Sequence, residues 1–292
     1  MSVKNILITG SKGQLGYELQ GLSYTHTYRG YKFFYTDIDT LDITNEDLVN
    51  KFFRENHIDC LINCAAYTAV DKAESEPEAA LLVNGRAVEW LVSACARNST
   101  LMVHVSTDYV FDGTTPVPYR EEDAVGPISV YGKTKLEGEK AVLGYEHGIV
   151  VRSSWLYSTR GKNFFNTILT MALEKDQLNV VYDQVGTPTY AGDLARVLLT
   201  LSDHFLSGKN KDGGGLFHYS NEGVCSWYDF AIEIVRLTGR QCRISPIETS
   251  QYPVPARRPH FSVLNKTKIR SYLLIDIPHW KESLINCIGQ LD

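Results

Sequence analysis

The stretch VKNILITGSKGQLGYELQGL, residues 3–22, decides the fold. A short apolar run, 3–9, leads directly into a glycine-rich turn from Gly10 to Gly16, and a helix-like segment follows at once. Such a turn lets the backbone approach a pyrophosphate, whose charge is met by the N-terminus of the helix. The spacing is G-x-x-G-x-x-G and not the usual G-x-G-x-x-G, but the order of strand, glycine turn and helix is that of the dinucleotide fingerprint. We therefore expect a dinucleotide site here, the alternative being a glycine turn without a ligand.

A second apolar run, 31–36, ends at Asp37, which lies 21 residues after Gly16. An acidic residue at this distance can accept hydrogen bonds from the ribose hydroxyls of the adenosine, which favours NAD over NADP. Lys12 and Arg29 could instead serve a 2′-phosphate, so the preference stays weak.

Strand-like and helix-like segments alternate through the first half of the chain. The helices are expected at 45–56, with Thr44 as the cap, and at 77–98, while buried strands are expected at 58–64 and 101–105. Alternation of this kind predicts an α/β fold built on a Rossmann-type, doubly wound parallel sheet.

The second half alternates less regularly and predicts a smaller α/β substrate-binding domain, interleaved with the first. We expect helices at 163–174 and 193–206, the latter packed on the nucleotide domain, a strand at 178–182, and a helix capped by Ser226. Gly213, Gly214 and Gly215 are expected in a surface loop. The predicted dinucleotide-binding domain is 1–152 with a return at about 176–215, and the substrate-binding domain is 153–175 and 216–292.

Composition is that of an ordinary globular protein, with 43% hydrophobic and 22% charged residues among 292. A net charge of −5 gives no reason to expect nucleic acid or a membrane surface as partner. No apolar run approaches the ~20 residues of a membrane span, and no signal-peptide core precedes Gly10, so a cytoplasmic protein is expected. The six cysteines have no C-x-x-C spacing and are expected as reduced thiols.

The segment SVYGKTKLEGEK, residues 129–140, predicts a helix capped by Ser129. Tyr131 and Lys135 are four residues apart and so share one face of it. The positive charge of Lys135 is expected to favour the phenolate and lower the pKa of Tyr131, which would suit acid–base chemistry. Ser106 and Thr107 end the strand just before, whereas His104 between two valines is expected as a satisfied core histidine.

Taken together, these motifs resemble the extended short-chain dehydrogenase/reductase superfamily and, within it, the dTDP-4-dehydrorhamnose reductases. The likeness covers almost the whole chain and rests on the glycine turn and on AAYTAVDKAE (65–74), STDYVFDG (106–113), YGKTK (131–135), RSSWLY (152–157), DQVGTPT (183–189) and RRP (257–259).

The resemblance implies reduction of the C4 ketone of a sugar nucleotide by NADPH or NADH. It makes Tyr131 the proton donor, Lys135 its electrostatic and ribose-binding partner, and Thr107 a hydrogen-bond donor to the reacting oxygen. Contacts with the substrate are implied for Thr107, Asp108, Trp155, Arg257 and Arg258. Cofactor contacts are implied for Gly10, Gly13, Gln14, Leu15, Gly16, Asp37, Asp42, Ile43, Ala65, Ala66, Tyr67, Tyr131 and Lys135.

Several alternatives stay open at this point. Arg257 and Arg258 suit a diphosphate, but either could form an ordinary salt bridge. The aromatic residues Tyr219, Trp227 and Tyr228 could form core or a sugar platform, and core is favoured. Glu18 matches a position where relatives are described as Mg²⁺-bridged homodimers, although a first-turn Glu also suits the helix dipole.

Resemblance to other proteins leaves two alternative functions open. One is a nucleotide-binding regulatory subunit similar to the beta subunit of methionine adenosyltransferase, and the other is a different sugar-nucleotide 4-keto reductase or epimerase. Related dehydratases carry an acid directly after Thr-Asp, where this chain has Tyr109, so dehydration is disfavoured.

Overall fold

The computed structural model describes residues 3–25, 28, 30–208 and 215–291. A six-stranded sheet lies at its centre in the order β10-β5-β4-β3-β1-β2, and every neighbouring pair is parallel. The strands are β1 Lys4–Thr9, β2 Tyr31–Thr36, β3 Cys60–Asn63, β4 Leu101–Thr107, β5 Gly148–Ser153 and β10 Gly215–His218. The predicted doubly wound parallel sheet is thereby confirmed.

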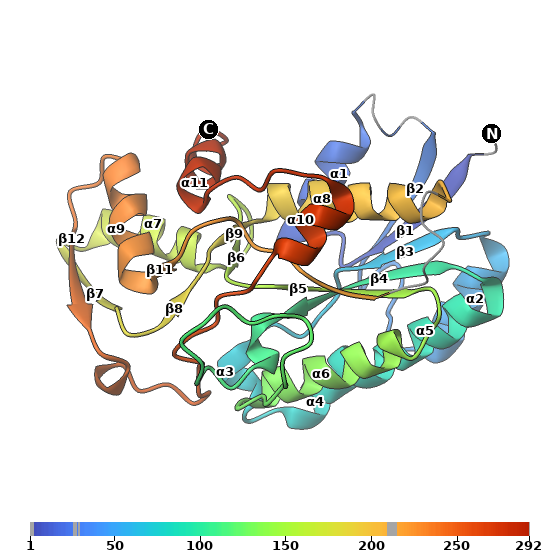
Figure 1. Cartoon of the computed structure of the whole chain (residues 1–292), viewed down its shortest axis with the longest axis horizontal. Coiled ribbons are helices and arrows are strands. Elements are labelled where there is room, and N and C mark those ends of the chain that lie inside the picture. The colour runs from blue at the N-terminus through green and yellow to red at the C-terminus, as the bar shows by residue number, and fades with distance from the viewer. Residues whose placement is uncertain (1–2, 26–27, 29, 209–214, 292) are drawn as a thin grey trace.

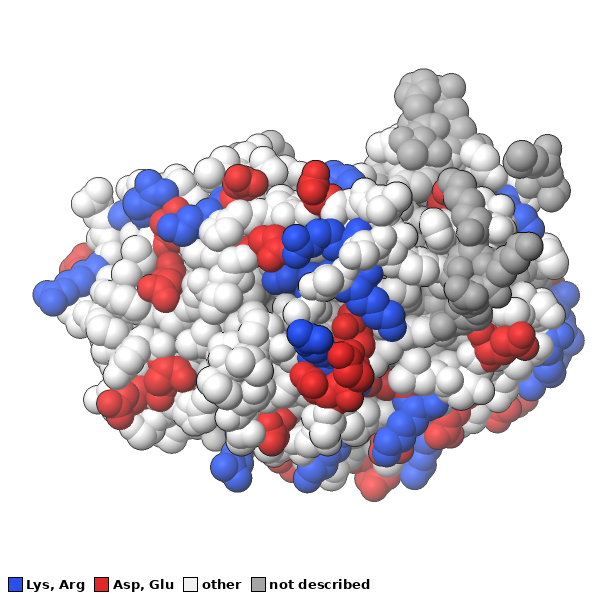
Figure 2. All heavy atoms as spheres, viewed as in Figure 1, with Lys and Arg blue, Asp and Glu red and all other residues white. Residues whose placement is uncertain are grey.

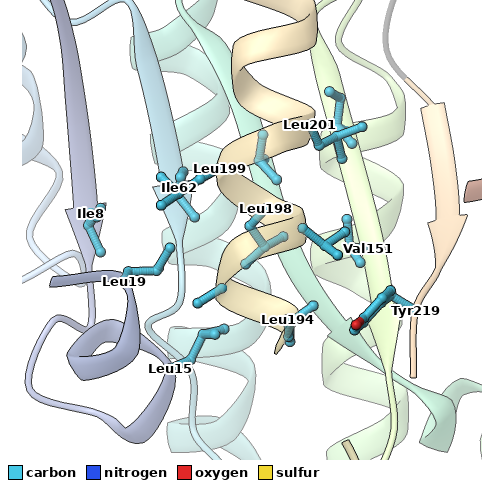
Figure 3. Close-up of a cluster of buried hydrophobic side chains, with 14 of the residues drawn as sticks. Ile8, Leu15, Leu19, Ile62, Val151, Leu194, Leu198, Leu199, Leu201 and Tyr219 are labelled. Atoms are coloured by element: carbon cyan, nitrogen blue, oxygen red, sulfur yellow. The ribbon is translucent and has the colours of Figure 1, made fainter. Parts of the chain in front are cut away.

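Helices cover both faces of this sheet (Figure 1). One face carries α1 (Gln14–Ser23), α8 (Ala191–Leu206) and α10 (Thr267–Leu273); the other carries α2 (Glu46–Glu55), α5 (Ala87–Asn98) and α6 (Val130–Leu143). Side chains alternate along a strand, so Ile6 and Ile8 pack in a first apolar cluster with α1, α8 and α10. Leu7 packs in a second cluster with α2, α5 and α6. Figure 3 shows the first cluster, with Leu194 and Leu198 of α8 directed at the strands.

The strand order creates a switch point beside β1. The chain leaves β1 toward β2 on one side and returns to β3 on the other. Ligands of doubly wound sheets bind outside the carboxyl ends of strands at such a point, because the two loops diverge there and leave a crevice. The loops that follow Thr9 and Asn63 therefore frame the candidate site.

Residues 77–98 form one continuous helix, as predicted, but it includes a π-helical turn. It comprises α4 (Pro77–Leu81), the π turn η2 (Leu82–Arg86) and α5. This is the one helix of the described residues that is long and apolar enough to cross a membrane, although no apolar run of that length was expected from the sequence. Its buried side chains, among them Val88 and Leu91, pack in the core beneath the sheet, as a core helix requires.

The second unit lies to the left in Figure 1 and has its own apolar cluster. Its elements are β6 Leu156–Tyr157, α7 Phe164–Glu174, β7 Gln177–Val181, β8 Val185–Gly186, β9 Thr189–Tyr190, β11 Cys225–Ser226, α9 Trp227–Leu237, β12 Arg243–Ile247 and α11 Trp280–Ile288. The strand β7 pairs with β12, whereas β10 joins the main sheet and α8 packs upon it. We propose to keep two interleaved units, with 177–181 moved to the second and 215–218 and 267–273 to the first.

Two local predictions need correction. Thr44 does not cap α2: the Asn45 side chain accepts from the Leu48 N–H, while Thr44 donates to Asp42. Gly215 begins a strand of the main sheet instead of lying in a surface loop; Gly213, Gly214 and Arg29 lie outside the described residues. The predicted caps Ser129 and Ser226 are confirmed, the latter as a full capping box with Asp229.

The described surface mixes its charges, and the cysteines are free. Figure 2 shows Lys and Arg side chains beside Asp and Glu on the face in view, without a broad surface of one sign. All six cysteines are unpaired, as expected, and five of them are buried.

A buried ion pair ties α6 to the sheet. The Arg152 guanidinium on β5 donates to both carboxylate oxygens of Glu139 at 2.7–3.1 Å, and the two side chains are 4% and 1% exposed. Arg152 also lies over the Phe111 ring. In this bidentate geometry each carboxylate oxygen accepts from the guanidinium, so both charged groups are hydrogen-bonded in the interior, which a single contact could not achieve.

We expect Glu139→Gln to lower the free energy of unfolding by about 3–5 kcal/mol, because it leaves a buried guanidinium without its counter-charge. Urea unfolding monitored by circular dichroism measures the change. Glu137→Gln on the same helix is the control, since it breaks only the exposed pair with Lys140 and should cost under about 1 kcal/mol. Similar losses in both variants would contradict this account.

Candidate functional site

The glycine turn and the loop after β3 touch at the switch point. Gly10 has φ of +66°, and a Cβ there would lie 2.7 Å from the backbone nitrogen of Ala65. A Cβ at Gly16 would lie 2.4 Å from the Gly10 carbonyl oxygen. Real Cβ atoms do not approach backbone so closely, and the αL conformation is open chiefly to glycine. The turn therefore needs glycine at both positions, and its N–H groups remain beside the start of α1.

Asp37 lies at the end of β2 and braces the same turn. One of its carboxylate oxygens accepts from the Lys12 N–H at 2.8 Å, and the other accepts from the Ile38 N–H. The Lys12 ammonium lies 2.6 Å from Asp39 in an exposed ion pair. Two carboxylates and one ammonium thus surround the position where the sequence predicts an adenosine ribose.

The other expected cofactor residues line the adjoining loops. The Asp42 carboxylate accepts hydrogen bonds from the N–H and the hydroxyl of Thr44, and the Ile43 side chain is buried. The loop with Ala65, Ala66 and Tyr67 is held by Asn84, whose side-chain oxygen accepts from the Tyr67 N–H and whose amide donates to the Tyr67 carbonyl.

Sequence reasoning missed Asn84, which sits in the π turn η2 and is fully buried. Its amide also donates to the Thr134 hydroxyl on α6, so one side chain joins the loop after β3 to the helix that carries Tyr131 and Lys135. The available signal was an Asn-Gly pair inside an otherwise apolar helix. π turns of this kind often occur at functional sites.

Gln14 and Leu15 have different environments. The Gln14 amide donates to the Leu156 carbonyl at 3.4 Å and its oxygen accepts from Asn163, which links the glycine turn to the second unit. Leu15 is buried in the cluster shown in Figure 3, so its side chain belongs to the core.

The structure brings Thr107, Tyr131 and the Tyr109 ring together where β4 ends. Tyr131 is held edge-on by Tyr109, with 5.5 Å between ring centroids. Burial raises the pKa of Tyr131 to about 12, and a hydrogen bond with Thr107 acts in the opposite direction. The expected lowering by Lys135 is thus not what this arrangement gives, because loss of solvation outweighs the favourable contacts.

Lys135 lies one helical turn beyond Tyr131 and is almost fully buried. Its Nζ donates to the Val105 carbonyl at 2.7 Å and lies 3.2 Å from His104 Nε2. Burial lowers the pKa of Lys135 to about 8, with Glu139 and Cys64 acting to raise it. An amine in this range can hold or release a proton near neutral pH.

The ends of β4 and β5 present a group of hydroxyls and one carboxyl. Thr107 donates to Asp108 at 3.1 Å, and burial raises the pKa of Asp108 to about 6. The hydroxyls of Ser106 and Ser153 are buried without a hydrogen-bond partner among the described residues. Buried polar atoms are rarely left unsatisfied, so a ligand at this edge would account for them.

Trp155 sits just beyond β5 in a strained conformation. Its φ is +47°, which is rare for a bulky residue and costs free energy unless the surroundings enforce it. The indole is stacked on Trp227 at 3.5 Å between centroids and lies against Gly186, where a Cβ would come within 2.6 Å. Trp227 therefore supports Trp155, while Tyr219 is buried core.

The two arginines differ. Arg258 donates to both carboxylate oxygens of Asp71 at 2.8 and 3.1 Å, so the salt-bridge alternative holds for it. Arg257 is exposed, and within the described part of the chain no hydrogen bond or ion pair engages it. Arg257 is thus the arginine with donors left for an anion.

Glu18 does not lie in a ready-made metal site. Burial raises the pKa of its carboxyl, and a hydrogen bond with Tyr190 acts against that rise. Across the described ranges, 3–208 with its gaps and 215–291, no three His, Cys, Asp or Glu side chains are grouped as metal ligands would be. A divalent ion at Glu18 would need ligands from elsewhere.

A helix whose tyrosine meets a strand-end threonine and whose lysine is buried one turn further on, packed on a parallel sheet whose first strand ends in a glycine turn, defines the class: an extended short-chain dehydrogenase/reductase. The family model described as "RmlD substrate binding domain" matches residues 4–292. Proteins named dTDP-4-dehydrorhamnose reductase from Sinorhizobium fredii and Escherichia coli are 41% and 38% identical; the alignments cover 95% and 98% of this chain and 94% and 98% of theirs. The chain belongs to this family of dTDP-4-dehydrorhamnose reductases.

Solved structures agree with that assignment. A dTDP-4-dehydrorhamnose reductase from Clostridium acetobutylicum has a TM-score of 0.92 at 44% identity, covering 98% of this chain and 99% of its own. One from Bacillus anthracis, in complex with NADP, has a TM-score of 0.92 at 33% identity, covering 99% and 100%. A UDP-glucose 4-epimerase from Brucella ovis, 18% identical with a TM-score of 0.78, shares the fold alone.

We expect Gly16→Ala to abolish measurable NADPH binding, because the new Cβ would force the Gly10 and Ser11 backbone out of the turn. Titration of NADPH fluorescence measures the affinity. Gly21→Ala on the same helix is the control: nothing lies within 4 Å of its Cβ, so binding should be unchanged. Unaltered affinity in Gly16→Ala would remove the turn from the cofactor site.

Proposed function

We propose that the protein reduces the C4 ketone of dTDP-4-dehydro-L-rhamnose to give dTDP-L-rhamnose, with NADPH or NADH as reductant. The observation that carries the proposal is the packing of α6 on β4, where Tyr131 meets Thr107 and Lys135 donates to the Val105 carbonyl, on the same parallel sheet that carries the glycine turn. Full-length similarity to reductases of that name supports the choice of substrate.

A bound reduced nicotinamide supplies the hydride in this reaction. The protein's own part is to handle the proton and the charge that develops on the ketone oxygen. Tyr131 keeps its proton at neutral pH, because its pKa is about 12, and gives it to that oxygen as negative charge builds up. The ammonium of Lys135 then stabilises the phenolate that remains.

Thr107 must exchange one partner for another. Its hydroxyl donates to Asp108 in this structure; in the proposed reaction it donates to the ketone oxygen instead. Asp108 has a pKa of about 6 and is therefore mostly ionised at neutral pH, when it can only accept hydrogen bonds. Sugar hydroxyls would supply donors to it, while Trp155 and Arg257 would contact the rest of the substrate.

For the cofactor we propose NADPH first and NADH second. The named relative in complex with NADP supports NADPH, whereas Asp37 suits a free 2′-hydroxyl and would repel a 2′-phosphate. Lys12 could offset that repulsion once released from Asp39.

We propose further that the enzyme is cytoplasmic and that a homodimer is the assembly to test. Glu18 is not grouped with two further His, Cys, Asp or Glu side chains within the described residues, so we expect a second copy to supply carboxylates if Mg²⁺ binds there. Sedimentation with Mg²⁺ and with EDTA tests the homodimer and its dependence on the metal, and a monomer under both conditions would reject both.

The alternative functions receive less support. The relatives from Sinorhizobium fredii and Escherichia coli, which span the chain, carry reductase names, which does not favour a regulatory subunit. The likeness to an epimerase is one of fold alone. Turnover of the sugar nucleotide, made in situ and followed by loss of NADPH absorbance, decides between these functions.

Tyr131→Phe should lower turnover by roughly 10²- to 10⁴-fold, the usual contribution of a general acid, because the proton donor is lost while the ring remains. NADPH affinity, measured by fluorescence, should stay within a few-fold. Tyr109→Phe is the matched control: it removes the hydroxyl of the neighbouring ring and should leave turnover within a few-fold. Equal losses in the two variants would speak against Tyr131 as the donor.

Asp37→Asn should shift preference toward NADPH by roughly 10-fold in the ratio of kcat/KM values, since it removes one charge near the 2′ position but keeps an acceptor for Lys12. Initial rates with both cofactors measure the ratio. Glu55→Gln, at the exposed end of α2, controls for net charge. A ratio that does not move would mean that Asp37 only braces the turn.

A further inference from the structure

A chain of buried polar side chains runs beneath Lys135 across three strands. Lys135 Nζ lies 3.2 Å from His104 Nε2 on β4, and His104 Nδ1 lies 2.9 Å from the Asn63 amide nitrogen on β3. Asn63 in turn contacts Thr9 at the end of β1. All four side chains are at most 2% exposed. The expectation that His104 is a satisfied core residue is confirmed, but one of its partners is the lysine of the site.

The direction of the hydrogen bonds in this chain is set by a backbone group. The N–H of Ala65 can only donate, and it points at Asn63 Oδ1 at 3.2 Å. The Thr9 hydroxyl donates to the same oxygen at 2.6 Å. Because that end of the amide is the oxygen, the end that faces His104 is the NH₂ group.

The tautomer of His104 follows from this. An NH₂ group donates, so Nδ1 of His104 accepts and carries no hydrogen. Burial and the nearby Lys135 hold the pKa of His104 well below its usual value, so the ring is neutral and its single hydrogen is on Nε2. That N–H is directed at Lys135 Nζ.

An N–H directed at an ammonium is unfavourable, because an ammonium has three donors and no lone pair. A neutral amine accepts such a hydrogen bond. To meet an ammonium with a lone pair, His104 would have to move its hydrogen to Nδ1, and Asn63 would then have to turn and lose its contact with Ala65. The row of hydrogen bonds therefore couples the protonation state of Lys135 to the orientation of the Asn63 amide, and through it to Ala65 in the loop after β3.

We propose that His104, oriented by Asn63, is a positioning residue that lowers the affinity of the Lys135 amine for its proton during the proposed reduction. The inference rests on the proposed function for its role in catalysis, but not for the tautomer itself. The proposal assigns part of the weakened proton affinity of Lys135 to one side chain, in addition to the effect of burial.

Other groups also face Lys135. Glu139 lies one turn further along α6 and is paired with Arg152, and Cys64 follows β3; both act to raise the pKa of Lys135. Tyr131 is one turn before it. Among the contacts of Lys135 Nζ in the described part of the chain, His104 is the one that directs a hydrogen at the amine.

The pH dependence of turnover supplies the first test. As pH rises through the pKa of Lys135, the ammonium that stabilises the Tyr131 phenolate is lost, so kcat falls on the alkaline side. In His104→Gln the amide can turn its oxygen to the ammonium, which should move the alkaline limb upward by roughly one pH unit. His104→Asn is matched to it: its shorter amide keeps the Asn63 contact but does not reach Lys135, so a smaller upward shift is expected.

A purely structural His104 would behave differently: both variants would lose activity and stability without moving the limb. An alkaline limb that stays in place or moves downward in folded His104→Gln would overturn the proposal. Wild-type turnover of the sugar nucleotide is measured alongside, so failure of the proposed function is recognised separately.

Nitrogen NMR of protein labelled at histidine tests the tautomer without any turnover. The resonances that vanish in whichever His104 variant folds should report a hydrogen on Nε2 and a bare Nδ1, unchanged across neutral pH. A hydrogen on Nδ1 instead would overturn the proposal, whatever the kinetics show.

Discussion

The inward-facing polar stripe of α6 is the constraint on which the rest of the structure depends. Tyr131, Lys135 and Glu139 are spaced four apart, so all three turn toward the sheet, where Lys135 and Glu139 are buried and Tyr131 is partly buried. Each must find its partner on a strand: Thr107 and Val105 on β4, and Arg152 on β5. Because these partners lie at fixed heights along parallel strands, they set both the rotation and the depth of the helix.

Burial has opposite effects on the two titrating groups of that stripe. It raises the pKa of Tyr131 and lowers the pKa of Lys135, since both shifts favour the uncharged form. A tyrosine that retains its proton beside a lysine close to losing one is suited to delivering a proton and then stabilising the phenolate. The buried Glu139–Arg152 pair limits how far the lysine pKa falls.

Much of this was predictable from sequence. Apolar runs between glycine and helix signals identify the parallel sheet, and the spacing of Tyr131 and Lys135 places them on one face before any coordinates are known. What failed had physical reasons. Thr44 and Asn45 are both good caps, and only the fit of Asp42 to Thr44 leaves Asn45 for the helix. Strand 177–181 alternates polar and apolar residues up to Val180, a pattern that does not tell which sheet it joins, so its pairing with β12 could not be predicted.

The fold class, the family likeness and the side chains that carry the proposed chemistry follow from local spacing and residue type, so they could be predicted before the structure. The tertiary structure alone decided what each side chain faces. It placed Arg258 against Asp71, stacked Trp155 on Trp227, and set His104 beneath Lys135. Contacts between residues far apart in the chain depend on how layers pack, and that packing controls solvation, hydrogen-bond direction and hence pKa.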